Sequence, residues 1–170
     1  MFTNLTNPPV EPVTLDDAKI FLRVDTDDHD ALLFDLIASA REQVERRASL
    51  ALIQRTVRLT LPVCGSRLRL PLSPIQSLVQ VTAGGEAVEA ELDTRPHPAW
   101  LHFPARREGF VEIDLVAGFG TSDADVPIPL RQAVLLLVAD AFEHRQREVG
   151  FERVSLRVDA LIAPYWGPRL

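Results

Sequence analysis

The chain has 170 residues, of which 46% are hydrophobic and 25% charged; this is enough for one domain with a core and excludes wholesale disorder. Its net charge of −6 argues against a protein that grips nucleic acid through phosphate contacts. A lone cysteine excludes an internal disulfide and a cysteine-based metal cluster, and the longest apolar stretch, Ala133 to Ala139, is too short to span a membrane.

Residues 1–13 contain three prolines and no hydrophobic period, so we expect an extended N-terminal arm outside the core. Thr14 is a candidate N-cap, with Asp16 and Asp17 in the first turn where the helix dipole favours anions. A short helix is predicted to run to about Arg23. The residues that it should bury are Leu15, Ala18, Phe21 and Leu22.

The acidic turn from Asp25 to Asp30 invites a calcium interpretation, which fails on spacing. An EF-hand loop needs Gly at its sixth position and Glu at its twelfth, and these places hold Asp30 and Leu36. We therefore predict no metal site here, and Asp27 or Asp28 as the cap of the next helix.

A long amphipathic helix is predicted from Ala31 to about Ala48. Its apolar residues form one stripe: Leu32, Leu33, Leu36, Ile37, Ala40, Val44 and Ala48. Arg41 with Glu45 and Glu42 with Arg46 are helical neighbours that support the helix weakly, on a face expected to be solvated or to meet a neighbouring subunit.

From Gln54 the hydrophobic period changes to two, which predicts an antiparallel β-domain over residues 51–126. Prolines exclude Leu70–Pro74 from a central strand, and Ala83–Glu86 is typical of a hairpin turn. Ala99–Phe103 and Phe110–Val116 complete the sheet. In the last of these, Val111, Ile113 and Leu115 should point inward, and Glu112 and Asp114 outward.

A helix from Pro127 to Glu148 is apolar nearly all round, so it must be buried on more than one side. It is either a fully enclosed central helix, or one side of it meets a neighbouring subunit. In the second case the interface residues are Leu135, Leu136 and Phe142. Together with residues 14–50, residues 127–149 are expected to form a helical bundle.

Residues 150–170 are too apolar for a solvent-exposed tail. Val154, Leu156 and Val158 alternate, which suits a strand added to the edge of a partner's sheet. Leu161, Ile162, Tyr165 and Trp166 have the character of interface anchors. The alternative is that this tail folds back on its own sheet; we favour partner binding.

No catalytic, cofactor or metal residues are predicted. Cys64 lies in a predicted turn with no base nearby, and the glycines at 118 and 120 lack the rest of a phosphate loop. Two alternative functions stay open. A DNA-packaging or assembly factor would use arginines 67, 69, 106, 107, 145, 147 and 153, and a small enzyme would use His97, His102 and Asp114.

The order of these segments resembles the head-tail connector, or adaptor, proteins of long-tailed phages and of gene transfer agents. The resemblance is carried by Thr14–Val24, Asp27–Glu45, Leu70–Ile75, Val116–Gly120 leading to Val126–Ala133, and Leu161–Tyr165. One departure is Trp166, where many relatives carry a basic residue. The resemblance implies an α+β fold: a small helical bundle from both ends of the chain, an inserted antiparallel β-domain and extended termini.

The function implied by this resemblance is structural. About a dozen copies would form a homo-oligomeric ring below the portal protein at the head-tail junction of the virion. The ring would extend the DNA channel and dock the stopper or tail-completion protein. Since no signal peptide is visible, assembly is expected in the bacterial cytoplasm. DNA would pass without specific binding, helped by the acidic balance of the chain. No cofactor, enzyme activity or membrane contact is implied.

Overall fold

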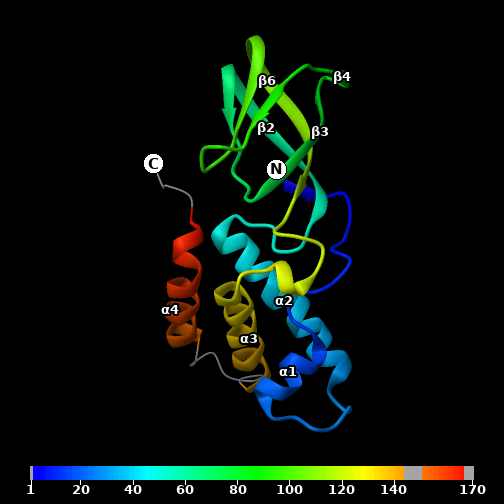
Figure 1. The fold of residues 1–170 in the computed structure, drawn as a ribbon, viewed down its shortest axis with the longest axis vertical. Coiled ribbons are helices and arrows are strands. Elements are labelled where there is room, and N and C mark those ends of the chain that lie inside the picture. The colour runs from blue at the N-terminus through cyan, green and yellow to red at the C-terminus, as the bar shows by residue number, and fades with distance from the viewer. Residues whose placement is uncertain (1, 144–150, 167–170) are drawn as a thin grey trace. The chain divides into compact units, whose positions relative to one another are not determined.

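The computed structural model describes residues 2–143 and 151–166, and these form two compact units. The β-unit comprises residues 2–9 and 49–119. The helical unit comprises residues 10–48, 120–143 and 151–166. Helices from both ends of the chain with an antiparallel sheet inserted between them confirm the predicted fold class (Figure 1).

Six strands build the sheet of the β-unit: β1 (Phe2–Asn4), β2 (Arg55–Arg69), β3 (Ile75–Ala83), β4 (Glu86–Ala87), β5 (Glu91–Asp93) and β6 (Trp100–Ala117). The order is β1-β2-β6-β3-β4, β5 also pairs with β6, and every pairing is antiparallel. The two segments expected at 99–103 and 110–116 are one continuous strand, β6, because β2 is long enough to pair along both of them.

The core of the β-unit follows the period-two pattern of the sequence. Val57 and Leu59 on β2 and Ile113 and Leu115 on β6 are buried in a single apolar cluster. The predicted hairpin at Ala83–Glu86 is confirmed, with both central glycines at positive φ, 61° and 88°, as a tight turn between twisted strands requires. Cys64, expected in a turn, lies instead within β2 opposite Glu108 and is exposed.

The N-terminal arm was expected to lie outside the core, but two parts of it contact the rest of the chain. Phe2–Asn4 pair with Val57–Leu59 as an edge strand, and Thr56 accepts a hydrogen bond at its carbonyl from the amide of Leu5. Farther along the arm, Pro12 and Val13 are buried. The lack of a period in residues 1–13 could not reveal the pairing of β1, because the strand that accepts it lies more than fifty residues away in the sequence.

The helical unit contains α1 (Leu15–Leu22), α2 (Asp30–Ala48), the short 3-10 helix η1 (Asp123–Asp125), α3 (Ile128–Glu143), α4 (Phe151–Ile162) and the 3-10 turn η2 (Ala163–Tyr165). The Thr14 hydroxyl accepts a hydrogen bond from the Asp17 amide at 3.1 Å, which confirms the predicted N-cap. No helix in the described part of the chain is long and apolar enough to cross a membrane.

Burial in the first three helices follows the predicted stripes with exceptions. Leu33, Ile37 and Val44 on α2 and Leu130 and Leu137 on α3 are buried. On α1 only Ala18 is buried and Phe21 is exposed, so the prediction of a buried Phe21 is wrong. The reason is length: a helix of two turns places its successive apolar residues around more than one face.

The prediction of a strand at Val154–Val158 is wrong, because Phe151–Ile162 form a helix. Val158 and Ile162, four residues apart, are both buried, and α4 packs along α3 (Figure 1). A spacing of four residues places side chains on one face of a helix, and the apolar face of α3 gives them a surface to cover. The alternation of three residues was too short to separate strand from helix.

Candidate functional site

Asp114, one member of the hypothetical catalytic set, has a structural role. Its carboxylate accepts hydrogen bonds from Arg58 Nε at 2.6 Å, Arg58 Nη2 at 2.7 Å and Gln80 Nε2 at 2.7 Å. The hydrogen bonds from Arg58 hold the pKa of Asp114 below its ordinary value, although burial opposes them. Asp114 is 4% exposed, so the expectation of a solvent-facing carboxylate is wrong: side chains from β2 and β3 cover it.

The histidines do not join Asp114 in a reactive constellation. His97 Nδ1 lies 3.4 Å from Ser73 Oγ, His102 lies on β6 opposite Arg67 and Glu91, and the ring of His29 meets Phe142 edge-on at 5.5 Å. The fourth histidine, at 144, lies outside the described residues. Within those residues no three His, Cys, Asp or Glu side chains are grouped to hold a metal ion.

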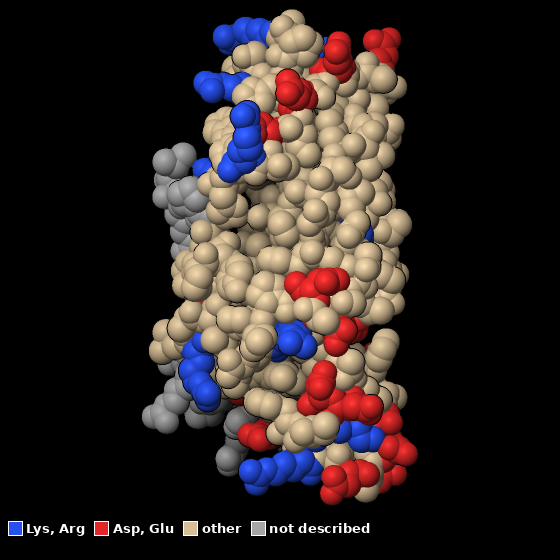
Figure 2. Space-filling model, in the orientation of Figure 1, with Lys and Arg blue, Asp and Glu red and all other residues tan. Residues whose placement is uncertain are grey.

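Lys19 neutralises part of the acidic turn between α1 and α2. Its Nζ lies 2.6 Å from Asp27 Oδ1 and 2.8 Å from Asp30 Oδ1. These hydrogen bonds raise the pKa of Lys19 and lower that of Asp27. Figure 2 shows acidic side chains gathered around α1 and this turn, with few basic ones among them. Lys19 therefore links two of these carboxylates, Asp27 and Asp30, which explains their proximity without a metal ion.

A second charged group is buried within the helical unit. Arg41 Nε donates to Glu11 Oε2 at 2.8 Å, and Arg41 Nη1 donates to Glu45 Oε2 at 3.1 Å. Arg41 and Glu45 are both buried, so the expectation that this pair lies on a solvated face is wrong. Burial disfavours the charged guanidinium, but the two carboxylates outweigh it and raise the pKa of Arg41. The group joins the N-terminal arm to α2.

Four of the arginines that a DNA-binding function would need, at 67, 69, 106 and 107, lie on the paired strands β2 and β6. Arg67 lies over the Trp100 ring, Arg106 contacts Glu108, and Arg107 lies over the Phe103 ring. Arginines 145 and 147 and the side chain of 153 lie outside the described residues. Three of these four arginines thus contact an aromatic or acidic neighbour.

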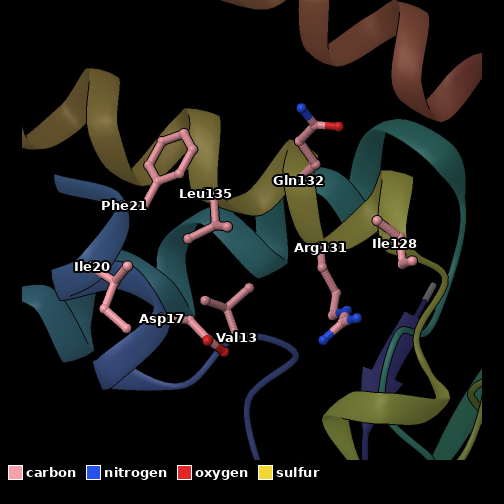
Figure 3. Close-up of a pocket in the computed structure, with 8 residues that line it drawn as sticks. All are labelled: Val13, Asp17, Ile20, Phe21, Ile128, Arg131, Gln132 and Leu135. Atoms are coloured by element: carbon pink, nitrogen blue, oxygen red, sulfur yellow. The ribbon is translucent and has the colours of Figure 1, made fainter.

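An open groove of about 330 Å³ lies between α1 and α3. Figure 3 shows side chains from both helices and from the preceding arm around one opening. The apolar residues that line it are Val13, Ile20, Phe21, Ile128 and Leu135, and the polar ones are Asp17, Arg131 and Gln132. Ile20 is 77% exposed and Ile128 is 70% exposed, so large apolar side chains on both rims face solvent.

One polar atom of this groove lacks a partner. Arg131 Nε is buried and makes no hydrogen bond, and within the described residues Arg131 and Asp17 form no ion pair. Sequence inspection missed the groove, since it named Leu135 alone of its lining residues as an interface candidate. One feature of the sequence could have indicated the groove: Ile20 and Phe21 are adjacent on a predicted helix that is too short to bury both side chains.

The predicted interface residues of α3, Leu135, Leu136 and Phe142, are half-buried. Packing of α3 on α1, α2 and α4 encloses much of its surface, and Leu135 lies in the groove. A role for these three residues in subunit contact stays a prediction.

The residues predicted to bind a partner through the C-terminal segment differ in burial and fall into three groups. Val158 and Ile162 are buried, whereas Leu156 is 72% exposed. Val154, Leu161, Tyr165 and Trp166 are half-buried. Ala160, Ala163 and Pro164 are exposed with Leu156, which gives α4 and η2 an outward apolar strip. The buried members hold α4 in the helical unit, and the exposed strip is what a partner can reach.

Residues 12–88 match the family model described as phage gp6-like head-tail connector protein. This range includes α1, α2, β2, β3 and β4. A comparison with curated proteins found no match.

Solved structures extend the likeness to the whole chain. A chain in the neck of an empty gene transfer agent particle, computed with C6 symmetry, is 26% identical, with a TM-score of 0.84; the match covers 100% of this chain and 97% of that one. A chain in the virion of a native gene transfer agent particle is 28% identical, with the same coverage and a TM-score of 0.77. A chain in the neck of a native particle computed with C12 symmetry is 28% identical, with the same coverage and a TM-score of 0.73.

Proposed function

We propose that this chain is a head-tail connector whose copies close a ring in the neck of a phage or gene transfer agent particle, because residues 12–88 match that family model and the whole chain resembles a neck protein. Head-tail connectors are structural proteins, so the function lies in contacts and not in catalysis. The observation that carries the proposal is the full-length likeness to a chain in a neck with cyclic symmetry. Identical subunits repeated around such an axis form a ring when each contacts the next in the same way.

In this proposal the ring has twelve copies, the symmetry used for one of the matching necks. One side of it meets the portal protein and the other meets the stopper or tail-completion protein, with DNA passing through the centre. The net charge of −6 supports passage without retention, because acidic walls repel phosphates.

The portal contact is assigned to the outward strip of α4 and η2. Leu156 is the largest exposed apolar side chain there, and Ala160, Ala163 and Pro164 extend the strip. Aromatic anchors carry much of the energy of an interface, and half-buried Tyr165 and Trp166 lie at the end of the strip. Val158 and Ile162 support this surface from beneath.

The test is to mix the chain with the portal protein encoded beside it and to image the product by electron microscopy. The unaltered chain should add symmetric density at the narrow end of the portal. Leu156→Glu and Ala160→Glu should abolish that density while the protein stays folded. Val79→Glu, at an exposed apolar residue of β3, is the matched control and should keep it.

A portal left bare by the unaltered chain would overturn the proposal. Steep, salt-sensitive DNA retention by the isolated chain would then favour a packaging factor, because phosphate contacts release counterions. Deletion of residues 150–170 is a poorer test than these substitutions, since it uncovers the apolar surface that Val158 and Ile162 bury.

A further inference from the structure

We infer that the groove between α1 and α3 is the site where each copy receives α2 of the next copy, through Phe34 and Asp35. This inference rests on the proposed ring and names the contact that would close it. It begins from the groove itself: an apolar opening of about 330 Å³ with exposed Ile20 and Ile128 on opposite rims (Figure 3).

The groove calls for an occupant with an acidic group beside an apolar one. Arg131 Nε is a buried donor without an acceptor, and a buried donor left unmatched is unfavourable. A carboxylate brought to it would form a charge-assisted hydrogen bond. Around it, Ile20, Phe21 and Leu135 offer an apolar lining for a large side chain.

A ring of more than two copies must use two different surfaces at each joint, because a self-complementary surface stops at a dimer. The groove therefore needs its complement elsewhere on the chain. Among the described residues outside the groove, six large apolar side chains are exposed: Leu5, Val10, Phe34, Val79, Phe110 and Leu156.

Only one of the six has an adjacent carboxylate that is free to reach Arg131. Phe34 is 59% exposed, and the exposed Asp35 beside it makes no hydrogen bond or ion pair within the described residues. Glu11, beside Val10, is held by Arg41. Leu5 and Val79 have no adjacent acid, and Leu156 is followed by Arg157, which would repel Arg131.

Phe110 is the nearest competitor and its acids are already paired. Glu108 contacts Arg106 at 3.3 Å, and Glu112 contacts Arg58 at 3.6 Å. Moving either carboxylate to Arg131 would break an existing ion pair, whereas Asp35 breaks none. The choice of Phe34 with Asp35 therefore follows from charge complementarity.

The neighbours of Phe34 on α2 also suit close approach. Ala31 and Ala38, three residues before it and four after it, lie on the same side of the helix and have small side chains. The α2 backbone can therefore approach the rims of the groove. Both surfaces belong to the helical unit, so the joint requires no particular placement of the β-unit.

Cysteine cross-linking on portal-bound assemblies tests the joint directly. Cys64 is exposed, so the background is Cys64→Ser. The chain carrying both Phe34→Cys and Ile128→Cys should give a ladder of covalent oligomers on mild oxidation. Chains carrying only one of the two should stay monomeric, and an equal mixture of the two single variants should give dimers and nothing larger.

Charge reversal provides an independent test. Asp35→Arg and Arg131→Asp should each lower the fraction of portals carrying a ring at least tenfold, and the double variant should recover it to within threefold of the unaltered chain. Asp28→Arg, which reverses another exposed acid of the helical unit, is the matched control and should leave the fraction unchanged.

The outcomes separate this inference from the proposed function. Rings that form on the portal without the ladder, and withstand both single reversals, would overturn the joint and leave the connector role intact. Cross-linking of Ile128→Cys to the portal or the stopper would also overturn it, because the groove would then have another occupant. A portal left bare by the unaltered chain would remove the proposed function itself.

Discussion

The β-unit and the helical unit differ in how their exposed apolar side chains are arranged. In the β-unit the long strands β2 and β6 pair over most of their length, and the apolar side chains converge in one cluster. The β-unit leaves Leu5, Val79 and Phe110 exposed and Arg107 Nε without a hydrogen bond. The helical unit leaves Ile20 and Ile128 exposed on opposite rims of one groove, which also holds the unmatched Arg131 Nε. The proposed assembly contacts are therefore assigned to the helical unit, because there the exposed apolar side chains line a groove.

Two tryptophans make this comparison measurable. Trp100 begins β6 in the β-unit, and Trp166 follows η2 in the helical unit. Trp166→Phe leaves a fluorescent reporter of the sheet, and Trp100→Phe leaves one of the helices. Urea unfolding of these two backgrounds reports which unit a substitution weakens, so each substitution is made in the background that reports on its own unit.

The largest effect is expected for Gly118→Ala in the β-unit. Gly118 has φ of 137°, and an added Cβ would collide with the backbone of Gln54. The free energy of unfolding should fall by about 4 kcal/mol or more, since both backbones directly adjoin the paired residues Arg55 and Ala117 and cannot separate without disturbing that pairing. Gly109→Ala is the matched control: its φ is 112° with open space around it, so only strain of about 1 to 3 kcal/mol is expected. Equal losses for the two would contradict the collision.

Arg41→Ala should destabilise the helical unit by about 3 kcal/mol, because it leaves Glu11 and Glu45 without their shared cation. The loss should be seen in the Trp166 reporter. Arg46→Ala, at an exposed position of α2, should change stability by less than about 0.5 kcal/mol. A comparable loss of stability from both variants would contradict the burial of Arg41 with its two carboxylates as the cause.

Asp114→Asn should cost the β-unit about 2 kcal/mol at neutral pH, because a carboxylate that accepts charged hydrogen bonds becomes a neutral amide. The pKa of Asp114 is lowered in the folded state from 3.8, so its contribution is present above that value and is lost as pH falls through the folded pKa. The gap between variant and unaltered chain, measured by urea unfolding across acid pH, should therefore narrow below pH 3.8. A constant gap would contradict an electrostatic cause.

The smallest stability effect is expected for Thr14→Ala, about 1 kcal/mol from loss of the N-cap of α1. The change should also weaken ring formation on the portal, because α1 carries Ile20 and Phe21 of the groove. Thr26→Ala, at an exposed site in the turn after α1, serves as control and should leave both stability and assembly unchanged. Loss of stability without any loss of assembly would count against the groove as a joint.

Local patterns were enough to predict most of the elements. Thr14 with two following acids marked the start of α1, and the alternation around Ile113 marked the last strand and its buried face. The order of the segments along the chain also indicated the connector family. These features depend on residues close in sequence, where side-chain chemistry constrains the backbone directly.

The remaining features required partners distant in the sequence. Three alternating residues at 154–158 predicted a strand, but a free apolar face on α3 makes a helix the better packing. The sequence predicted that Asp114 and Arg41 would face solvent. The fold instead brings Arg58 and Gln80 to Asp114, and it brings Glu11 to Arg41. The groove likewise exists only because α1 and α3 lie side by side. Sequence alone therefore determined most of the elements and their order, because local side-chain chemistry constrains the backbone. Tertiary packing decided the type of the C-terminal element, which charges were buried and which apolar side chains stayed exposed.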